Sequence, residues 1–394
     1  MFNKSITLLL IIVATSLTSL AQVLTVSQLA GQVNPLTSAV PFLGITPDAR
    51  AGSMGDCGVA SSPDVSSLFW NAAKYAFAES EFGVEASYTP WLRKLVTDIN
   101  LSYLVAYKKL DKLQTISGSL RYFSLGNIVF TDITGTTTGN YSPNEFALDF
   151  GYTLLLSKNL SGAIALRYIH SDLTGGNSNE GTQTHAGNAI AADISVYYRH
   201  NTTINGQNAQ WALGTNITNI GNKITYSDDS KSNFLPMNLR IGGSLMYEID
   251  DYNSIMAQLD LNKMLIPTPP IYSTTSTNII EAGMNPDVAV AQAIFQSFYD
   301  APGGFKEEMN EIAYSFGLEY WYAKQFAIRG GYFHENEKKG NRKFLTTGLG
   351  LKLNVVNLDL SYIVALQNDH PLKNTLRMSL TFELGKNKKT ETKE

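Results

Sequence analysis

The sequence predicts an all-β fold: a transmembrane antiparallel β-barrel of about 14 strands with an N-terminal plug segment inside the lumen. The first observation behind this prediction is a two-residue alternation of apolar with small or polar side chains, which starts near residue 81. The second is length. The alternating runs span about 9–12 residues, as a tilted membrane strand requires, whereas strands of soluble proteins cluster near five or six. The third is composition, because 20 Tyr and 18 Phe stand against only 16% charged residues.

Residues 1–21 have the features of a signal peptide. Lys4 supplies the basic start, and the apolar run 6–13 is too short to cross a bilayer as a helix. Small residues at Ser19 and Ala21 fit cleavage before Gln22, and no cysteine follows the cleavage point. No later segment has 18 consecutive apolar residues, so no membrane helix is expected.

Residues 22–80 are expected to form the plug segment. They are rich in Ala, Ser, Gly and Pro and show no sustained alternation. A segment of this kind could extend into the periplasm or fold inside the lumen. The part SSLFWNAAKYAF, residues 66–77, is too apolar for a free tail, and we expect a short helix or turn in the barrel mouth.

Within this segment, ITPDARAGSMGDCGVASSPD places three glycines at three-residue spacing beside acidic residues. The spacing is not that of a phosphate-binding loop, and no Lys-Ser/Thr pair follows it. The aspartates are too far apart for a calcium loop, so no metal and no cofactor are predicted. We interpret Gly52, Gly55 and Gly58 as structural positions that allow tight turns close to the wall. Asp48 and Arg50 are expected to pair with each other or with charges of the lumen.

The barrel wall is predicted over residues 81–385. In NEFALDFGYTLL, residues 144–155, Phe146, Leu148 and Phe150 share one face while Ala147 and Asp149 share the other. The predicted strands are 81–89, 98–108, 113–125, 144–156, 160–170, 189–199, 209–217, 237–249, 253–264, 310–321, 325–334, 343–354, 357–366 and 374–385. A charged tail, 386–394, follows the last strand.

The predicted connections alternate in length. Most links after even-numbered strands are tight, although the link near 200–208 is somewhat longer. Links after odd-numbered strands are generally long, notably 126–143, 171–188, 218–236 and 265–309. Outer-membrane barrels have short periplasmic turns and long outer loops. The pattern therefore predicts a multi-pass protein of the outer membrane of a Gram-negative cell.

Polar side chains of the predicted strands point to the lumen. They include charges of both signs, which are expected to bind the plug and one another, while a porin-like selectivity ring is the alternative. These side chains are Asp149, Arg167, Asp193, Arg240, Asp260, Glu319, Arg329 and Arg377.

The outer loop 265–309 is the segment that barrel architecture explains least. Its prolines favour an extended start. Val288, Ala291, Ile294, Phe295 and Phe298 are expected on one face of a short helix that ends at APGG. Such a helix either folds over the lumen or binds a partner. The candidate partner-binding residues are Ile266, Pro267, Pro269, Pro270, Ile294, Phe295 and Phe298.

Several function classes are disfavoured by composition. The net charge of −4 and the absence of a basic stripe give no reason to expect nucleic-acid binding. The single cysteine, Cys57, cannot form an internal disulfide and is interpreted as a small buried residue. The five histidines mostly fall in or beside predicted outer loops, where solvated rim residues are common, so no enzyme is predicted.

Four short segments of the plug, 47–52, 54–55, 58–60 and 71–74, carry a resemblance to a known family. Together with DLNKMLIPTPP at 260–270, they resemble the PorV family of outer-membrane components of the type IX secretion system, within the wider FadL-like barrels. The plug signature is shared with sister proteins of that system, and the loop segment favours PorV. The resemblance runs from the signal peptide to the last strand.

The resemblance implies a plugged barrel and a role without covalent chemistry. PorV-like proteins bind the C-terminal signal domain of cargo that emerges from the type IX translocon barrel. They then deliver the cargo to a sortase, or attachment, complex that joins it to lipopolysaccharide. The implied partners are the translocon, cargo signal domains, attachment-complex subunits and outer-membrane lipid. A FadL-like transporter of hydrophobic small molecules is the alternative function, with the plug and lumen forming the ligand path.

Overall fold

The wall of the molecule is a closed antiparallel barrel of 14 strands, which confirms the predicted fold. The computed structural model describes residues 32–93, 96–131, 134–175, 183–227, 231–273, 279–366 and 372–386. The predicted signal peptide and residues 387–394 of the predicted tail lie outside this range. The wall strands are β1 (Ser80–Pro90), β2 (Ile99–Lys109), β3 (Gln114–Leu125), β6 (Asn144–Leu155), β7 (Leu160–Asp172), β8 (Gly187–Ile204), β9 (Gln207–Gly221), β10 (Asn238–Glu248), β11 (Asn253–Met264), β14 (Ala313–Tyr322), β15 (Phe326–His334), β16 (Lys343–Leu353), β17 (Val356–Ala365) and β18 (Leu376–Lys386).

Each strand pairs with its neighbour along the wall, and β1 pairs with β18 to close the barrel. The two-residue alternation places apolar side chains outward and small or polar ones inward. On β6, Leu148 and Phe150 are exposed on the outer surface, while Ala147 and Asp149 are buried inside. An outward apolar face and a polar interior are the arrangement of outer-membrane barrels.

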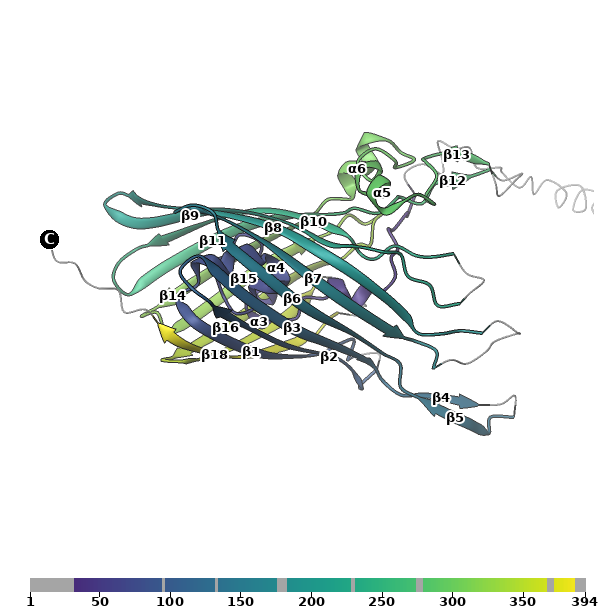
Figure 1. Ribbon diagram of the computed structural model, residues 1–394, viewed down its shortest axis with the longest axis horizontal. Coiled ribbons are helices and arrows are strands. Elements are labelled where there is room, and N and C mark those ends of the chain that lie inside the picture. Colours follow the sequence, from purple (N-terminus) through teal and green to yellow (C-terminus); the bar gives the residue numbers. More distant parts are fainter. Residues whose placement is uncertain are drawn as a thin grey trace, which may run out of the picture.

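The connections divide the barrel into two ends. The inner end carries the tight turns and the C-terminus, and the outer end carries the long loops (Figure 1). The predicted longer link near 200–208 is wrong: β8 and β9 continue to a two-residue turn at Asn205 and Gly206, whose φ values are 52° and 83°. Positive φ at both residues is typical of a tight hairpin turn. The ends of these two strands could not be recognised from sequence, because the residues near the turn are mostly polar and apolar residues no longer occupy every second position.

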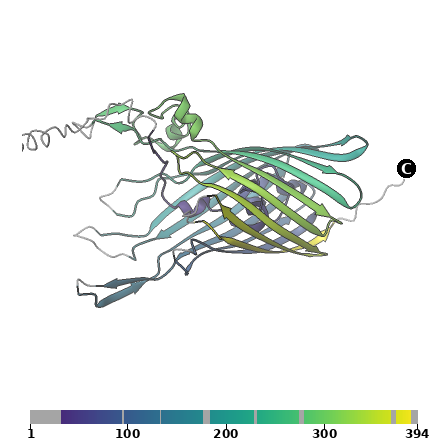
Figure 2. The ribbon, with the colours of Figure 1, turned by 180° about the vertical axis from the view of Figure 1, so that it is seen from behind.

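Two further hairpins and two helices lie at the outer end. One hairpin is β4 (Ile128–Thr131) with β5 (Thr137–Tyr141), and the other is β12 (Ile271–Tyr272) with β13 (Ile280–Ala282). The helices α5 (Val290–Gln296) and α6 (Phe305–Asn310) belong to the same loop as β12 and β13. Figure 2 shows this loop and the β4–β5 hairpin at the end opposite the C-terminus.

Most of residues 40–79 are buried. They form η1 (Pro41–Gly44), α3 (Ala49–Gly52), α4 (Ser67–Trp70) and η2 (Ala72–Phe77), and α3 and α4 lie within the barrel outline (Figure 1). Hydrogen bonds tie the segment to inward-facing side chains all round the wall, as from Thr153 Oγ1 to the Ala72 carbonyl (2.8 Å) and from Ser244 Oγ to the Ala60 carbonyl (2.6 Å). Among the described residues, no helix has the length and apolar character needed to span a membrane.

Candidate functional site at the outer end of the barrel

Asp48 and Arg50 anchor the glycine-rich stretch, but they do not pair with each other. The Asp48 carboxylate caps α3 by accepting from the Ala51 amide (2.8 Å), and it also accepts from Trp70 Nε1 (2.7 Å). Arg50 forms ion pairs with Asp64 (2.9 Å) and with Glu319 of β14 (2.8 Å). Of the two predicted pairings, the structure therefore has the one with a lumen charge.

The three glycines of this stretch all sit where a side chain would collide. Gly55 has a φ of 71°, and a Cβ there would lie 2.7 Å from the backbone nitrogen of Tyr332 on β15. A Cβ at Gly52 would lie 2.8 Å from the Arg377 guanidinium of β18, and one at Gly58 would lie 2.5 Å from the Trp70 ring. Gly52 and Gly55 thus allow close approach to the wall, whereas Gly58 allows close packing within the plug segment itself.

Most charged side chains of the lumen are engaged by one another or by the plug segment. Arg167 binds Asp193 (2.9 Å), and Arg329 binds Glu319 (2.6 Å). Asp260 accepts from the amides of Gly58 and Val59 at 2.7 and 2.9 Å. These contacts match the interpretation that the charges bind the plug and one another, and the described residues form no ring of solvated charges.

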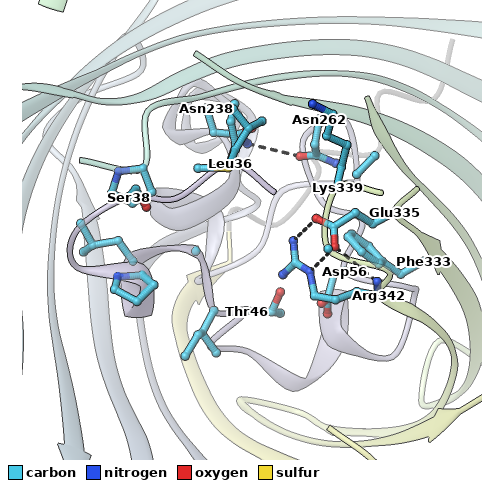
Figure 3. A pocket seen from close by; sticks show the side chains of 18 of the residues that line it. Leu36, Ser38, Thr46, Asp56, Asn238, Asn262, Phe333, Glu335, Lys339 and Arg342 are labelled. Atoms are coloured by element: carbon cyan, nitrogen blue, oxygen red, sulfur yellow. Dashed lines mark hydrogen bonds and ion pairs between the residues drawn. The ribbon is translucent and has the colours of Figure 1, made fainter. Parts of the chain in front are cut away.

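A cavity of about 470 Å³ lies between the outer side of residues 35–46 and the wall. Exposed Pro35 and Thr37 line its rim, and buried Trp70 lies on its floor. Figure 3 looks into the cavity, with Ser38 on one side and Phe333 on the other. Its lining combines aromatic rings with amides and charged groups, as small-molecule sites commonly do.

The outer loop is fixed to the barrel by a buried cluster of ion pairs. Lys339 Nζ binds Glu307 (2.6 Å) and Glu311 (2.9 Å), and Lys263 binds Glu311 (2.7 Å) and Glu308 (3.0 Å). Burial raises the pKa of Glu307, but hydrogen bonds from Lys339 Nζ and the Gly303 amide outweigh burial and hold that pKa below its ordinary value. The loop is therefore held by charge pairing on α6 as well as by apolar packing.

Apolar packing of the loop centres on Ala293. This residue of α5 is fully buried against Met237, Leu265 and Ile266, and Ile294 packs beside them. Of the predicted partner-binding residues, Ile266 and Pro267 are buried and are not at the surface. Pro269, Pro270 and Ile294 are half-buried, whereas Phe295 and Phe298 are exposed.

The sequence model of the family described as "Type IX secretion system protein PorV" matches residues 28–271, more than half of the 394 residues. The chain belongs to the PorV family. This places it in a protein family of the type IX secretion system. No curated protein sequence matches the chain.

Solved structures with a similar fold are distant in sequence from this PorV-family chain. The toluene transporter TodX of P. putida is 10% identical with a TM-score of 0.47, and the match covers 86% of this chain and 99% of TodX. A Pseudomonas aeruginosa FadL homologue is 10% identical with a TM-score of 0.43, covering 86% and 98%.

Sequence reasoning missed part of the exposed surface of this PorV-family loop. Phe295 and Phe305 are 70% and 79% exposed, and Phe298, Tyr299 and Met309 are also exposed. Tyr299 and Phe305 flank the APGG turn, which the sequence predicts only as the end of a helix. The five side chains Phe295, Phe298, Tyr299, Phe305 and Met309 are hereafter called the loop aromatic patch.

The predicted apolar face of α5 is divided in the structure. Val288 and Ile294 pack inward, but Ala291, Phe295 and Phe298 face outward. The prediction placed the large apolar side chains of the helix at one contact face, whereas the small side chain of Ala293 makes the close contact with the barrel.

Histidines were considered as candidate catalytic residues. His170 Nδ1 lies 2.9 Å from the Asn188 amide oxygen, and His334 Nδ1 lies 3.0 Å from the Tyr332 hydroxyl. His370 lies outside the described residues. Within the described ranges, no group of three His, Cys, Asp or Glu side chains is placed to bind a metal ion.

Proposed function

We propose that this PorV-family barrel is a cargo receptor and shuttle of the type IX secretion system. It binds the C-terminal signal domain of secreted proteins after the translocon barrel releases them. It then delivers them to the sortase-containing attachment complex while it remains in the outer-membrane lipid.

The observation that carries this proposal is the loop aromatic patch. Several large apolar side chains exposed on one loop mark a surface that binds a protein or a membrane, and aromatic residues contribute much of the binding energy at protein interfaces. The patch sits on a loop whose position is fixed by the Lys339 and Lys263 ion pairs. A rigidly held apolar surface loses little conformational entropy when it binds a partner.

The alternative, transport of a hydrophobic small molecule, has the outer cavity in its favour. A transporter needs a path through the lumen, however, and the cavity floor is formed by the buried plug segment. Buried Trp70 of the plug segment and Arg240 of β10 both line the cavity, and Arg240 Nη1 donates to the Phe69 carbonyl (3.1 Å), so the plug segment and the wall are joined there. The closed floor supports a role at the outer surface over one in transport.

The test replaces Phe295, Phe298, Tyr299 and Phe305 together by Ser in the native host. We expect surface-attached cargo, and co-purification of translocon or attachment-complex subunits, to fall about ten-fold or more, because interface aromatics each contribute over ~1 kcal/mol.

The matched control carries Ile128→Ser, Val129→Ser and Phe130→Ser on the exposed β4–β5 hairpin, which also lies at the outer end. It should retain cargo attachment. Normal cargo attachment by the loop variant, with loss of hydrophobic-ligand uptake instead, would contradict the shuttle and support the transporter.

A further inference from the structure

The β8–β9 hairpin extends past its neighbours at the inner end of the barrel. β7 pairs with β8 only as far as Tyr198, and β10 pairs with β9 only as far as Ala209. β8 and β9 continue to pair with each other up to Ile204 and Gln207. Figure 1 shows this hairpin at the end that carries the C-terminus. Residues 199–204 of β8 therefore have a neighbouring strand on one side only.

Aromatic side chains mark where the hairpin leaves the membrane. Tyr198, His200 and Trp211 lie on its outer face, with the Trp211 ring centre 5.2 Å from Tyr198 and 5.7 Å from His200. In outer-membrane barrels, aromatic residues gather at the two interfaces between bilayer and water. Beyond them, residues 201–208 are mostly polar and mostly exposed. The projecting hairpin is therefore in water, on the side of the short turns, which is the periplasmic side of such barrels.

The projecting part of β8 has an open backbone edge. The Arg199 amide donates to the Asn159 carbonyl in the β6–β7 turn (2.9 Å), so the backbone of Arg199 faces the β7 side. Every second residue of a strand directs its backbone groups to the same edge, so Asn201 and Thr203 face that side too. Among the described residues, no strand lies opposite them there. Their amides and carbonyls are available to an extended chain that adds a strand.

This edge lacks the features that normally prevent strand addition. Exposed edges are commonly blocked by proline, by lysine on the edge strand or by a β-bulge. Residues 200–204 contain neither proline nor lysine. The pairing of β8 with β9 is regular from Ile194 to Ile204, so no bulge turns the edge away. The edge is therefore accessible to a partner.

Positive charge lies beside the open edge, on the β7 side. Lys158 stands in the β6–β7 turn and Lys112 in the β2–β3 turn, and both side chains are exposed. The two turns are neighbours, because the Leu155 amide donates to the Leu113 carbonyl (2.8 Å). A chain that lies along the edge of β8 meets these lysines, which favour acidic side chains on that chain.

Acidic side chains near these turns are engaged or lie elsewhere. Asp111 accepts from amides of its own turn at 2.7 and 2.8 Å. Glu81 of β1 acts on Lys109 of β2. Glu248 lies on the β9 side of the hairpin, where it accepts from Asn208 Nδ2 (2.8 Å). A second copy of the chain, paired edge to edge, would bring like charges together, so charge favours a different, acidic partner.

We propose that the open edge of β8, residues 199–204, binds an extended acidic segment of a periplasmic protein, which adds a strand to the hairpin. Hydrogen bonds to the backbone of Asn201 and Thr203 align the segment, and Lys112 and Lys158 attract its acidic side chains. The edge lies at the opposite end of the barrel from the loop aromatic patch. This docking site is therefore separate from the proposed cargo-binding function.

The test uses the full-length protein in nonionic detergent and two end-blocked peptides of about eight residues, long enough to cover the edge. The acidic peptide is TEVETEVE and the basic one is TKVKTKVK. Binding is followed by amide-resolved hydrogen exchange. The acidic peptide should protect the amides of Asn201 and Thr203 and bind about ten-fold or more tightly than the basic one. This preference should shrink in about 0.5 M salt, which screens exposed charges.

Thr203→Pro should weaken binding of the acidic peptide about five-fold or more, because proline has no amide hydrogen to donate. The pairing of β8 with β9 does not use that amide. Continued protection of the Thr202 and Ile204 amides, which face β9, shows that the hairpin of the variant is intact. Thr203→Val keeps the amide and is the matched control, which should bind as the parent does.

The double variant Lys112→Gln and Lys158→Gln should lose most of the preference for the acidic peptide. Lys324→Gln, at an exposed lysine of the β14–β15 turn, should keep it. Thr203→Cys, oxidised in native outer membranes, should form no disulfide-linked dimer. Such a dimer would show that a second copy covers the edge and would overturn the proposal. Absence of peptide binding, equal or tighter binding of the basic peptide, or unchanged binding by an intact Thr203→Pro hairpin would overturn it as well.

Discussion

Single residues of the plug segment determine how closely it approaches the wall. Gly55 combines a left-handed backbone conformation with contact against the backbone of Tyr332, and the wall presents Gly331 at the same contact. Gly55 of the plug segment and Gly331 of β15 therefore lie together where the two backbones are in contact. A residue with a Cβ, or one that cannot adopt the positive φ, could not stand at Gly55 unless one of the two segments moved.

We predict that Gly55→Ala destabilises the barrel by about 1–3 kcal/mol, because the added Cβ clashes with main-chain atoms and the φ of 71° is unfavourable for alanine. Thermal unfolding followed by the gel-mobility shift of the folded barrel measures the effect. Gly44→Ala is the matched control, since a Cβ there meets nothing within 4 Å. Equal melting temperatures for the two variants would show that the close approach is not required.

For single residues, the sequence predicted whether a side chain points into the barrel, but not which residue it pairs with there. Alternation correctly placed Asp149 and Arg167 inside the barrel, because the side-chain direction of a strand follows from its period. The pairing of Arg50 with Glu319 spans 269 residues of sequence. No local pattern encodes such a contact, since it depends on the register of the closed wall and on the path of the plug.

Among the elements, α6 shows how a long loop is held in one position. Lys339 is buried between Glu307 and Glu311, and Lys263 binds Glu311 from β11. Asn34 Nδ2 adds a bond to Glu307 (3.2 Å), so the beginning of the described chain joins the same cluster. The loop, the β15–β16 connection and the plug segment are thereby linked at the outer end.

We predict that Lys339→Met loosens this loop by about 2–3 kcal/mol, because two buried carboxylates lose their cation. Limited proteolysis near the turn at residues 301–304 should become faster, while Lys338→Met, at a lysine that forms no ion pair among the described residues, should leave the rate unchanged.

The lowered pKa of Glu307 means that its stabilising contribution is present above its unfolded value of 4.5 and is lost as pH falls through the lower folded pKa. In Lys339→Met that pKa should rise, because burial then acts without the cation, so the acceleration of proteolysis that Glu307 causes on acidification of the parent should weaken in the variant. An unchanged cleavage rate would argue against the ion-pair anchor.

The strands were predictable from sequence, and so was the short helix α5 of the outer loop, but the packing of that loop was not. Each predicted run lies on one wall strand because a lipid-facing surface requires an apolar residue at every second position. The largest departures are β8 and β9, whose polar inner-end hairpin carries no such requirement. In α5 the buried position is Ala293, and a small residue at a tight contact cannot be distinguished in sequence from a small residue exposed to water.

At the scale of the whole molecule, wall and plug segment form one hydrogen-bonded body. Thr346 Oγ1 accepts from the Gly55 amide and donates to the Ser53 carbonyl, both at 2.8 Å. Comparable contacts occur all round the barrel. Gln258 of β11 donates to the carbonyl of Cys57 in the plug segment, and Asn216 of β9 donates to the carbonyl of Trp70 in the same segment. A lumen filled in this way should not pass ions.

We predict that the intact protein forms no conducting pore in a planar bilayer, and that removal of residues 41–79 produces discrete conductance steps. The wall strands keep their own hydrogen bonds after this removal, and water can solvate the polar side chains that the plug segment contacted. Removal of the outer hairpin, residues 128–141, is the control and should leave the bilayer silent. Steady conductance by the intact protein would contradict a closed lumen.

The closing contact between β1 and β18 has a consequence for biogenesis. The plug segment binds both strands of this seam, through Ser66 to Glu85 on β1 (2.6 Å) and through the Ala49 amide to Ser379 on β18 (2.9 Å). Because it precedes β1 and lies inside the closed wall, we expect it to be in place before the last strand pairs with the first. The N-terminal segment then presents its own hydrogen-bonding groups to the incoming β18 and acts as a template for barrel closure.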